Sequence, residues 1–207
     1  MTNSNKESRT EPTDWISRWQ RTARRIRVPL GFFTAVIYLS ELLRHKVCLT
    51  AVALSLLLVL PGLWLRAYAA GYVKKNKELT QTGPYAYTRN PLYLGSLLIA
   101  LGFALALLSW PMVLALTVGF GIIYVPVVAS EERFLRATFA DFDAYCARVP
   151  RLLPRLTAAP SEGERGSFSF ALYLHHREYN AAIGAALLYL TLLLLPPVLN
   201  ALQHGHQ

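Results

Sequence analysis

A run of polar and aromatic residues between positions 83 and 95 contains residue types that are typical of a binding site. Gly83-Pro84 favours a turn, and Pro91 is a residue type that suits the first turn of a helix. Arg89 would then lie beside the N-terminus of that helix, where free backbone N–H groups attract negative charge. A guanidinium at such a place could hold a carboxylate or a phosphate.

Three tyrosines accompany this arginine, at positions 85, 87 and 93. The face of an aromatic ring attracts cations such as a sulfonium or a quaternary ammonium. Tyrosines are equally typical of the aromatic belt at a membrane surface, so the rings alone leave both interpretations open.

Two adjacent glutamates form the second candidate group. Glu131 shares an apolar stripe with Leu135 and Phe142, so we expect it to point inward. Glu132 is rotated by about 100° and should face the surface or an arginine. Glu131 could hold an ammonium group, which together with Arg89 and the tyrosines would satisfy S-adenosylmethionine. A lipid headgroup would satisfy the same groups.

The elements that position these residues are expected to lie in a membrane. The chain has 207 residues, of which 54% are apolar and 16% charged, a composition too apolar for one soluble domain. A membrane-spanning helix needs roughly 17–25 mostly apolar residues. The sequence therefore predicts an all-α integral membrane protein of about five transmembrane helices, at 28–43, 47–68, 91–108, 111–129 and 181–202.

Two further helices are expected outside the spans. Segment 1–27 should be a cytoplasmic N-terminal segment with an interfacial helix. Residues 131–149 should form a cytoplasmic amphipathic helix that ends before Pro150. The remainder, 28–207, is predicted to be one membrane-embedded domain.

Short connections and small residues predict how the spans pack. The turn at 108–111 is so short that the helices on either side of it must form an antiparallel hairpin. The third span carries a row of small residues that would let another helix approach closely, namely Gly95, Gly102 and Ala106.

Basic residues set the orientation. Segments 1–27, 66–90 and 131–179 lie on one side of a five-span protein and hold 19 of its 21 Lys and Arg residues. The positive-inside rule makes that side cytoplasmic, in a membrane that we expect to be a bacterial inner membrane. The net charge of +9 is thus a topology signal, and no nucleic-acid partner is expected.

The polar run and the glutamates together resemble a known superfamily of membrane enzymes, the isoprenylcysteine carboxyl methyltransferases and phospholipid methyltransferases. The resemblance covers about 70–155 and is carried by Gly83-Pro84-Tyr85, Tyr87, Arg89-Asn90-Pro91, Tyr93, Gly95, Glu131-Glu132, Tyr145 and Val149-Pro150.

The resemblance implies an S-adenosylmethionine-dependent enzyme that methylates a lipophilic or lipid acceptor at the cytoplasmic membrane face. Arg89 and Glu131 are the implied catalytic residues. The residues implied to bind the cofactor are Lys77, Glu78, Leu79, Thr80, Tyr85, Asn90, Pro91, Leu92, Tyr93 and Glu131. No metal is implied, and His175-His176 lacks the carboxylate and cysteine companions of a metal site.

Two positions depart from the family pattern. Asn90 stands where the family usually has a histidine, so a role for a titrating imidazole does not carry over. Val127 stands where prenylcysteine enzymes have an arginine for the substrate carboxylate, which argues against a prenylcysteine substrate.

Two other functions fit the sequence. One is a non-catalytic, lipid-binding membrane protein of the same fold. The other is a membrane reductase that uses NADPH and shares a similar cytoplasmic layout.

Overall fold

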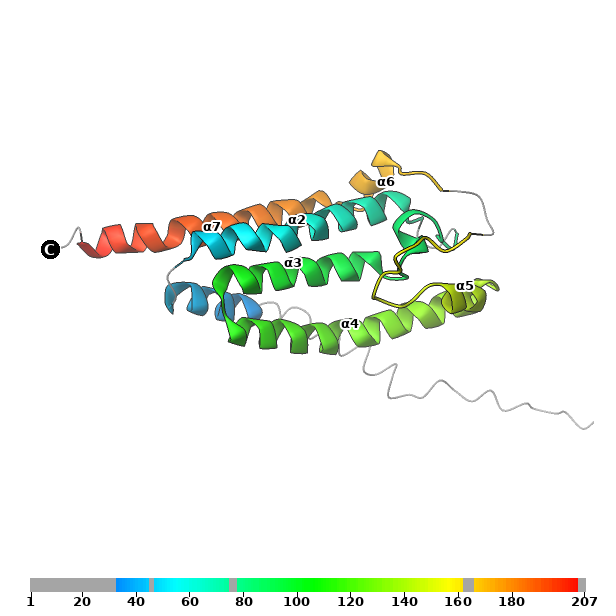
Figure 1. The fold of residues 1–207 in the computed structure, drawn as a ribbon, viewed down its shortest axis with the longest axis horizontal. Helices are drawn as coiled ribbons and strands as arrows, with labels where there is room; N and C mark the ends of the chain where they lie inside the picture. The colour runs from blue at the N-terminus through cyan, green and yellow to red at the C-terminus, as the bar shows by residue number, and fades with distance from the viewer. Residues whose placement is uncertain (1–32, 45–46, 75–77, 162–165, 205–207) are drawn as a thin grey trace, which may run out of the picture.

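A computed structural model describes residues 33–44, 47–74, 78–161 and 166–204 of the chain (Figure 1). These residues form an elongated bundle of helices and contain no strand. The helix expected within 1–27 lies outside the described residues. Residues 33–44 are helical, and the remaining elements are α2 (Leu49–Tyr72), the short 3₁₀ turn η1 (Gly83–Ala86), α3 (Pro91–Leu107), α4 (Trp110–Thr138), α5 (Phe142–Arg148), α6 (Phe170–His175) and α7 (Tyr179–His204).

Three of the described helices are long and apolar enough to cross a membrane. They are α2, α4 and the part of α7 from Tyr179 to Val198. These helices match the second, fourth and fifth predicted spans. Helix α3 lies where the third span was predicted and is apolar, but with 17 residues it is shorter than the others.

The closest packing in the bundle is between α2 and α3, and glycines make it possible. A Cβ atom built on Gly95 would lie 2.7 Å from the backbone oxygen of Gly62, and one on Gly102 would lie 3.1 Å from the backbone oxygen of Ser55. Any larger side chain would push the two helices apart. The predicted close approach along the small residues of the third span is therefore confirmed.

The predicted hairpin is also confirmed, because α3 and α4 run antiparallel and are joined at Leu108 and Ser109 (Figure 1). Leu108 ends α3 in the left-handed conformation with φ 49°. The Ser109 hydroxyl caps α4 by accepting a hydrogen bond from the Met112 N–H at 3.2 Å. It also donates to the buried carboxylate of Glu41 at 2.5 Å, which ties the helix at 33–44 to this turn.

The prediction of one amphipathic helix over 131–149 is wrong. Helix α4 continues without a break to Thr138, the chain is extended at Phe139, and α5 begins only at Phe142. The break lets Phe139 and Phe142 both reach a small core around Tyr145, formed by Phe142, Tyr145, Val149 and Ala159 with Leu79, Leu135, Phe139 and Cys146 against it. The apolar residues of the predicted stripe thus meet in one core, although they come from two helices.

Candidate functional site

The polar run before α3 is fixed in place by the chain that follows α5. Segment 150–159 lies antiparallel to segment 86–90. Three backbone hydrogen bonds join them: Arg89 N–H to Pro150 O at 2.9 Å, Arg155 N–H to Tyr87 O at 3.0 Å and Ala159 N–H to Ala86 O at 2.9 Å. A loop that would otherwise be free at the membrane surface is thereby held in one conformation.

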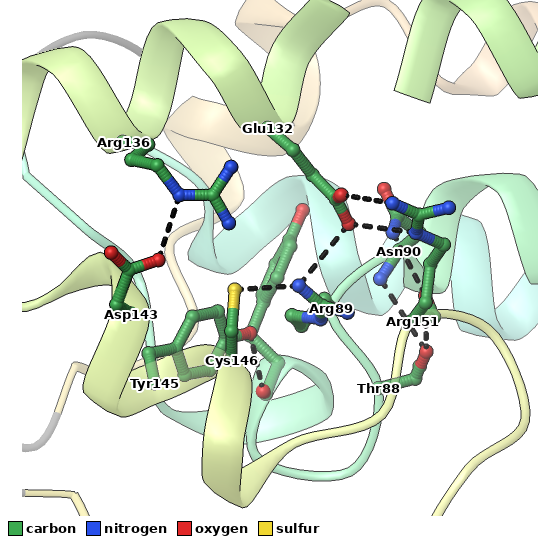
Figure 2. Close-up of polar contacts among 10 residues, drawn as sticks. Thr88, Arg89, Asn90, Glu132, Arg136, Asp143, Tyr145, Cys146 and Arg151 are labelled. Carbon is green, nitrogen blue, oxygen red and sulfur yellow. Dashed lines mark hydrogen bonds and ion pairs between the residues drawn. The ribbon is translucent and has the colours of Figure 1, made fainter. Parts of the chain in front are cut away.

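Two buried side chains strengthen this pairing (Figure 2). The Thr88 hydroxyl donates to the Leu152 carbonyl at 3.0 Å, and the Asn90 amide nitrogen donates to the Arg151 carbonyl at 2.8 Å. Asn90 occupies the N-cap position of α3, yet its side chain does not cap the helix. The N-terminus of α3 therefore has no side-chain cap from Asn90.

Glu132 joins the end of α4 to both of these segments through two arginines (Figure 2). Its carboxylate lies 3.2 Å from Nη1 of Arg89 and also accepts hydrogen bonds from Arg151, one of them from Nε at 3.0 Å. The Nη1 group of Arg89 contacts the sulfur of Cys146 on α5 at 2.6 Å. Glu132 is only 7% exposed and its pair with Arg89 is largely buried, whereas the side chain of Arg151 is 55% exposed.

The expected orientation of the two glutamates is wrong in part. Glu131 was expected to point inward, but it is exposed, and Glu132 is the buried one. The buried face of α4 runs through Val128 and Glu132, because the break after Thr138 separates α4 from the stripe used for the prediction. The expectation that Glu132 could face an arginine is correct.

Glu131 is nevertheless held by a member of the polar run. The Tyr93 hydroxyl on α3 donates a hydrogen bond to its carboxylate at 2.8 Å. The Tyr93 ring in turn contacts Tyr124 edge to face, with ring centroids 4.9 Å apart, and Tyr124 stacks on Phe120 of the same helix. The N-terminal end of α3 and the C-terminal part of α4 thus present a carboxylate next to a group of aromatic rings.

Tyr85 lies buried beside this group. Burial raises the pKa of its phenol far above the ordinary value, and the nearby Tyr145, Glu131, Glu178 and Tyr93 raise it further. Glu131 of α4 and Glu178, which precedes α7, thus both act on the Tyr85 phenol. Its backbone carbonyl accepts a hydrogen bond from the Tyr145 hydroxyl at 2.8 Å, which anchors η1 to α5.

Sequence reasoning missed an ion pair on the other side of α3. Arg66 of α2 lies 2.7 Å from the carboxylate of Glu178, and it donates to the Leu92 carbonyl at 3.2 Å and to the Ser96 hydroxyl. An arginine within an apolar span is costly and usually functional, so Arg66 could have been noticed from the sequence. Nothing in the sequence distinguishes Glu178 in this way, because a glutamate in a polar loop is not costly.

The remaining predicted cofactor residues are spread over this end of the bundle. Glu78 is exposed and pairs with Lys74 at 3.0 Å, and Thr80 is partly buried. Leu79 packs against the small core around Tyr145. Lys77 lies outside the described residues. Tyr87 is 39% exposed.

Comparison with known proteins finds one family model that matches the part of the chain holding most of these elements. Residues 43–141 match the phospholipid methyltransferase family. The match covers just under half of the chain. The match spans α2, η1, α3 and all of α4, so it contains both the Arg89–Glu132 and the Tyr93–Glu131 pairs. The resemblance to this family that the motif residues indicated is thereby confirmed.

Two curated relatives carry names that refer to metal resistance. The chain is 37% identical over 95 residues to the cobalt-zinc-cadmium resistance protein CzcN of Cupriavidus metallidurans, a match covering 46% of the chain and 43% of that protein. It is 35% identical over 100 residues to the nickel-cobalt-cadmium resistance protein NccN of Alcaligenes xylosoxydans xylosoxydans, covering 48% of the chain and 46% of that protein. The chain thus spans less than half the length of either relative. No solved structure matches it.

Among the described residues, no group of three or more His, Cys, Asp or Glu side chains is placed to hold a metal ion.

Proposed function

We propose that the chain transfers a methyl group from S-adenosylmethionine to a lipophilic acceptor at the cytoplasmic face of the membrane. The observation that carries the proposal is the Tyr93–Glu131 hydrogen bond beside the buried ring of Tyr85. It brings a carboxylate and several aromatic rings to one place within the part of the chain that matches a methyltransferase family.

The residues at this place suit the charges of S-adenosylmethionine, which carries an ammonium, a carboxylate and a methylated sulfonium. Glu131 would hold the ammonium, and the rings of Tyr93 and Tyr124 would face the sulfonium. The uncapped first turn of α3 would receive the carboxylate. Arg89 was expected to take that role, but Glu132 already pairs with it, so we assign Arg89 a positioning role.

The bound sulfonium supplies a methyl group that is already strongly electrophilic, and the protein therefore needs mainly to position the acceptor and exclude water. Tyr85 would help to exclude water, since its ring is buried beside Glu131 and Tyr93. The ion pairs of Glu132 with Arg89 and Arg151 would help to position the acceptor, because they fix the segment before α3.

The topology that goes with this function has five crossings, the helix at 33–44 and α3 being added to the three helices of spanning length. The distribution of Lys and Arg would then put the N-terminus and the site on the cytoplasmic side.

Binding of radiolabelled S-adenosylmethionine to the purified full chain tests the proposal. Glu131→Gln should weaken binding by about tenfold, as expected for loss of one charged hydrogen bond. Asp143→Asn is the matched control, because this exposed carboxylate pairs with Arg136 and lies outside the proposed pocket. Equal binding by the wild type and Glu131→Gln would overturn the assignment of the pocket.

The same assay separates the other two functions. A membrane reductase would bind labelled NADPH and not S-adenosylmethionine, whereas a non-catalytic lipid-binding protein would bind neither. Transfer of the labelled methyl group to a lipid extract, followed by mass analysis of the product, would identify the acceptor.

A further inference from the structure

Segment 150–159 is longer than the segment with which it pairs. The pairing begins between Pro150 and Arg89 and ends between Ala159 and Ala86, so residues 150–159 lie opposite only residues 86–89. The chain is nevertheless hydrogen-bonded at both ends of this stretch. The surplus residues must therefore bulge away from the paired backbone as a loop with fixed ends.

Two leucines of this loop are exposed. Leu153 is 75% exposed and Leu156 is 100% exposed, whereas the flanking Val149 and Ala159 belong to the small core around Tyr145. Single exposed leucines are ordinary on a protein surface, but these two stand three positions apart in one short loop. The fold thus presents two apolar side chains together at a fixed place outside its core.

The same loop is basic. Residues 144–161 include no acidic residue and three arginines, at positions 148, 151 and 155. Arg151 binds Glu132 through Nε and Nη2, yet its side chain remains 55% exposed (Figure 2). Because Glu132 also pairs with Arg89, one carboxylate serves two guanidinium groups, and the cluster keeps a positive charge. Arg151 is its exposed member, so an anionic group would be attracted there.

The position of the loop along the bundle brings it to the membrane surface. Residues 86–90, with which it pairs, lead directly into α3, and α3 packs against α2, a helix long enough to cross a membrane. In Figure 1 the yellow segment after α5 turns back along the bundle to the start of α3. At this level apolar side chains reach the boundary between headgroups and hydrocarbon, and arginines reach lipid phosphates.

We infer that the loop at 150–156 binds an anionic phospholipid of the surrounding membrane. Leu153 and Leu156 enter the boundary of the acyl chains, and the exposed guanidinium of Arg151 contacts the lipid phosphate. A second copy of the chain fits this surface poorly, because its own loop would bring the same positive charge. The inference is independent of methyl transfer, since it requires only that the bundle spans a membrane. The bound lipid would hold the segment that fixes the polar run before α3.

Photo-crosslinking of the full chain in nanodiscs tests this surface. Benzoylphenylalanine replaces Leu156, whose complete exposure means that the fold should tolerate the change. The nanodiscs contain phosphatidylglycerol and phosphatidylcholine in equal amounts. The matched control is position 138, because Thr138 is also exposed but follows Glu132 by six residues, which places it about 9 Å further along α4.

Mass spectrometry after irradiation should find lipid adducts at position 156 and about tenfold fewer at position 138, which lies beyond the headgroups. Equal lipid yields at the two positions would overturn the inference. Adducts of position 156 to a second copy of the chain, in place of lipid, would also overturn it.

The composition of the adducts tests the arginine. Leu187 on α7 is 58% exposed within a span, so benzoylphenylalanine at that position reports the bulk bilayer. The ratio of phosphatidylglycerol to phosphatidylcholine adducts should be about threefold higher at position 156 than at position 187. Sodium chloride at about 0.5 M should reduce this excess by screening. Equal ratios at the two positions in low salt would contradict the selection of an anionic lipid. No S-adenosylmethionine is present, so these results are separate from the test of the proposed function.

Discussion

Arg89 and Glu132 form a largely buried ion pair that joins the loop before α3 to the end of α4, with Nη1 of Arg89 3.2 Å from the carboxylate. Arg151 binds the same carboxylate from the segment after α5. One acidic side chain thus connects three parts of the chain that are far apart in sequence, and all three border the candidate site.

The first prediction concerns this carboxylate. Glu132→Gln should lower the free energy of unfolding by about 3 kcal/mol, because it leaves two guanidinium groups without their negative partner. Thermal unfolding of the purified chain in detergent would measure the loss. Arg136→Gln removes one member of an exposed pair with Asp143 and should cost under about 1 kcal/mol. Equal losses in the two variants would mean that the cluster does not stabilise the fold.

Thr88 offers a second test of the same region. Thr88→Val keeps the shape of the side chain but removes the hydroxyl that donates to Leu152 and accepts from the Asn90 N–H. We expect a loss of about 1–3 kcal/mol in stability, since both partners are left without a hydrogen bond.

The control for Thr88 is an exposed threonine. Thr138→Val removes a hydroxyl that bonds only within the last turn of α4, and its effect should stay within about 0.5 kcal/mol. Chemical unfolding of both variants would show the difference. A neutral Thr88→Val variant would contradict the role of segment 150–159 as a support for the polar run.

The third prediction concerns the contact between α2 and α3. Gly95→Ala places a methyl group 2.7 Å from the Gly62 backbone oxygen, so the helices must separate, at a cost of about 1–3 kcal/mol. Gly121→Ala meets open space and should be neutral or stabilising by up to about 1 kcal/mol, from helix propensity alone. Melting temperatures that fall alike in the two variants would argue against close packing at Gly95.

The elements of the bundle were easier to predict from the sequence than the direction of single side chains. Apolar length and small residues located the three helices of spanning length and the α2–α3 contact, because both depend on local composition. The burial of Glu132 in place of Glu131 depends on where α4 ends and on arginines 43 residues before and 19 residues after Glu132. No periodicity within α4 contains that information.

The Arg66–Glu178 pair illustrates the same limit. The cost of an arginine in an apolar helix could be read from the sequence, but its partner stands 112 residues later in a loop. Only the return of the chain through α6 and α7 brings the two together.

The fourth prediction concerns alkaline pH. The pKa of Tyr85 is raised in the folded chain above its ordinary value of 10.0, mainly by burial. A raised pKa means that the folded state holds this proton more tightly, so the associated stability is complete below pH 10 and is lost as the pH rises further. The stability difference between wild type and Tyr85→Phe should therefore change above pH 10 and stay constant between pH 7 and 9. A difference that is constant throughout would mean that Tyr85 is not buried.

The final prediction separates the hydroxyl of Tyr93 from its ring. Tyr93→Phe keeps the edge-to-face contact with Tyr124 but removes the hydrogen bond that orients Glu131. Hydrogen bonds to charged groups contribute about 1.5–3 kcal/mol, and an exposed carboxylate should lie at the lower end, so the Kd for S-adenosylmethionine should rise by about tenfold. Tyr173→Phe on α6 is the control, since this tyrosine contacts Phe170 outside the proposed pocket. Stability should hardly change in either variant, because Glu131 can hydrogen-bond to water instead. A loss of binding in Tyr93→Phe without a loss of stability would therefore assign the hydroxyl to the site, whereas unchanged binding would leave Tyr93 only a packing role.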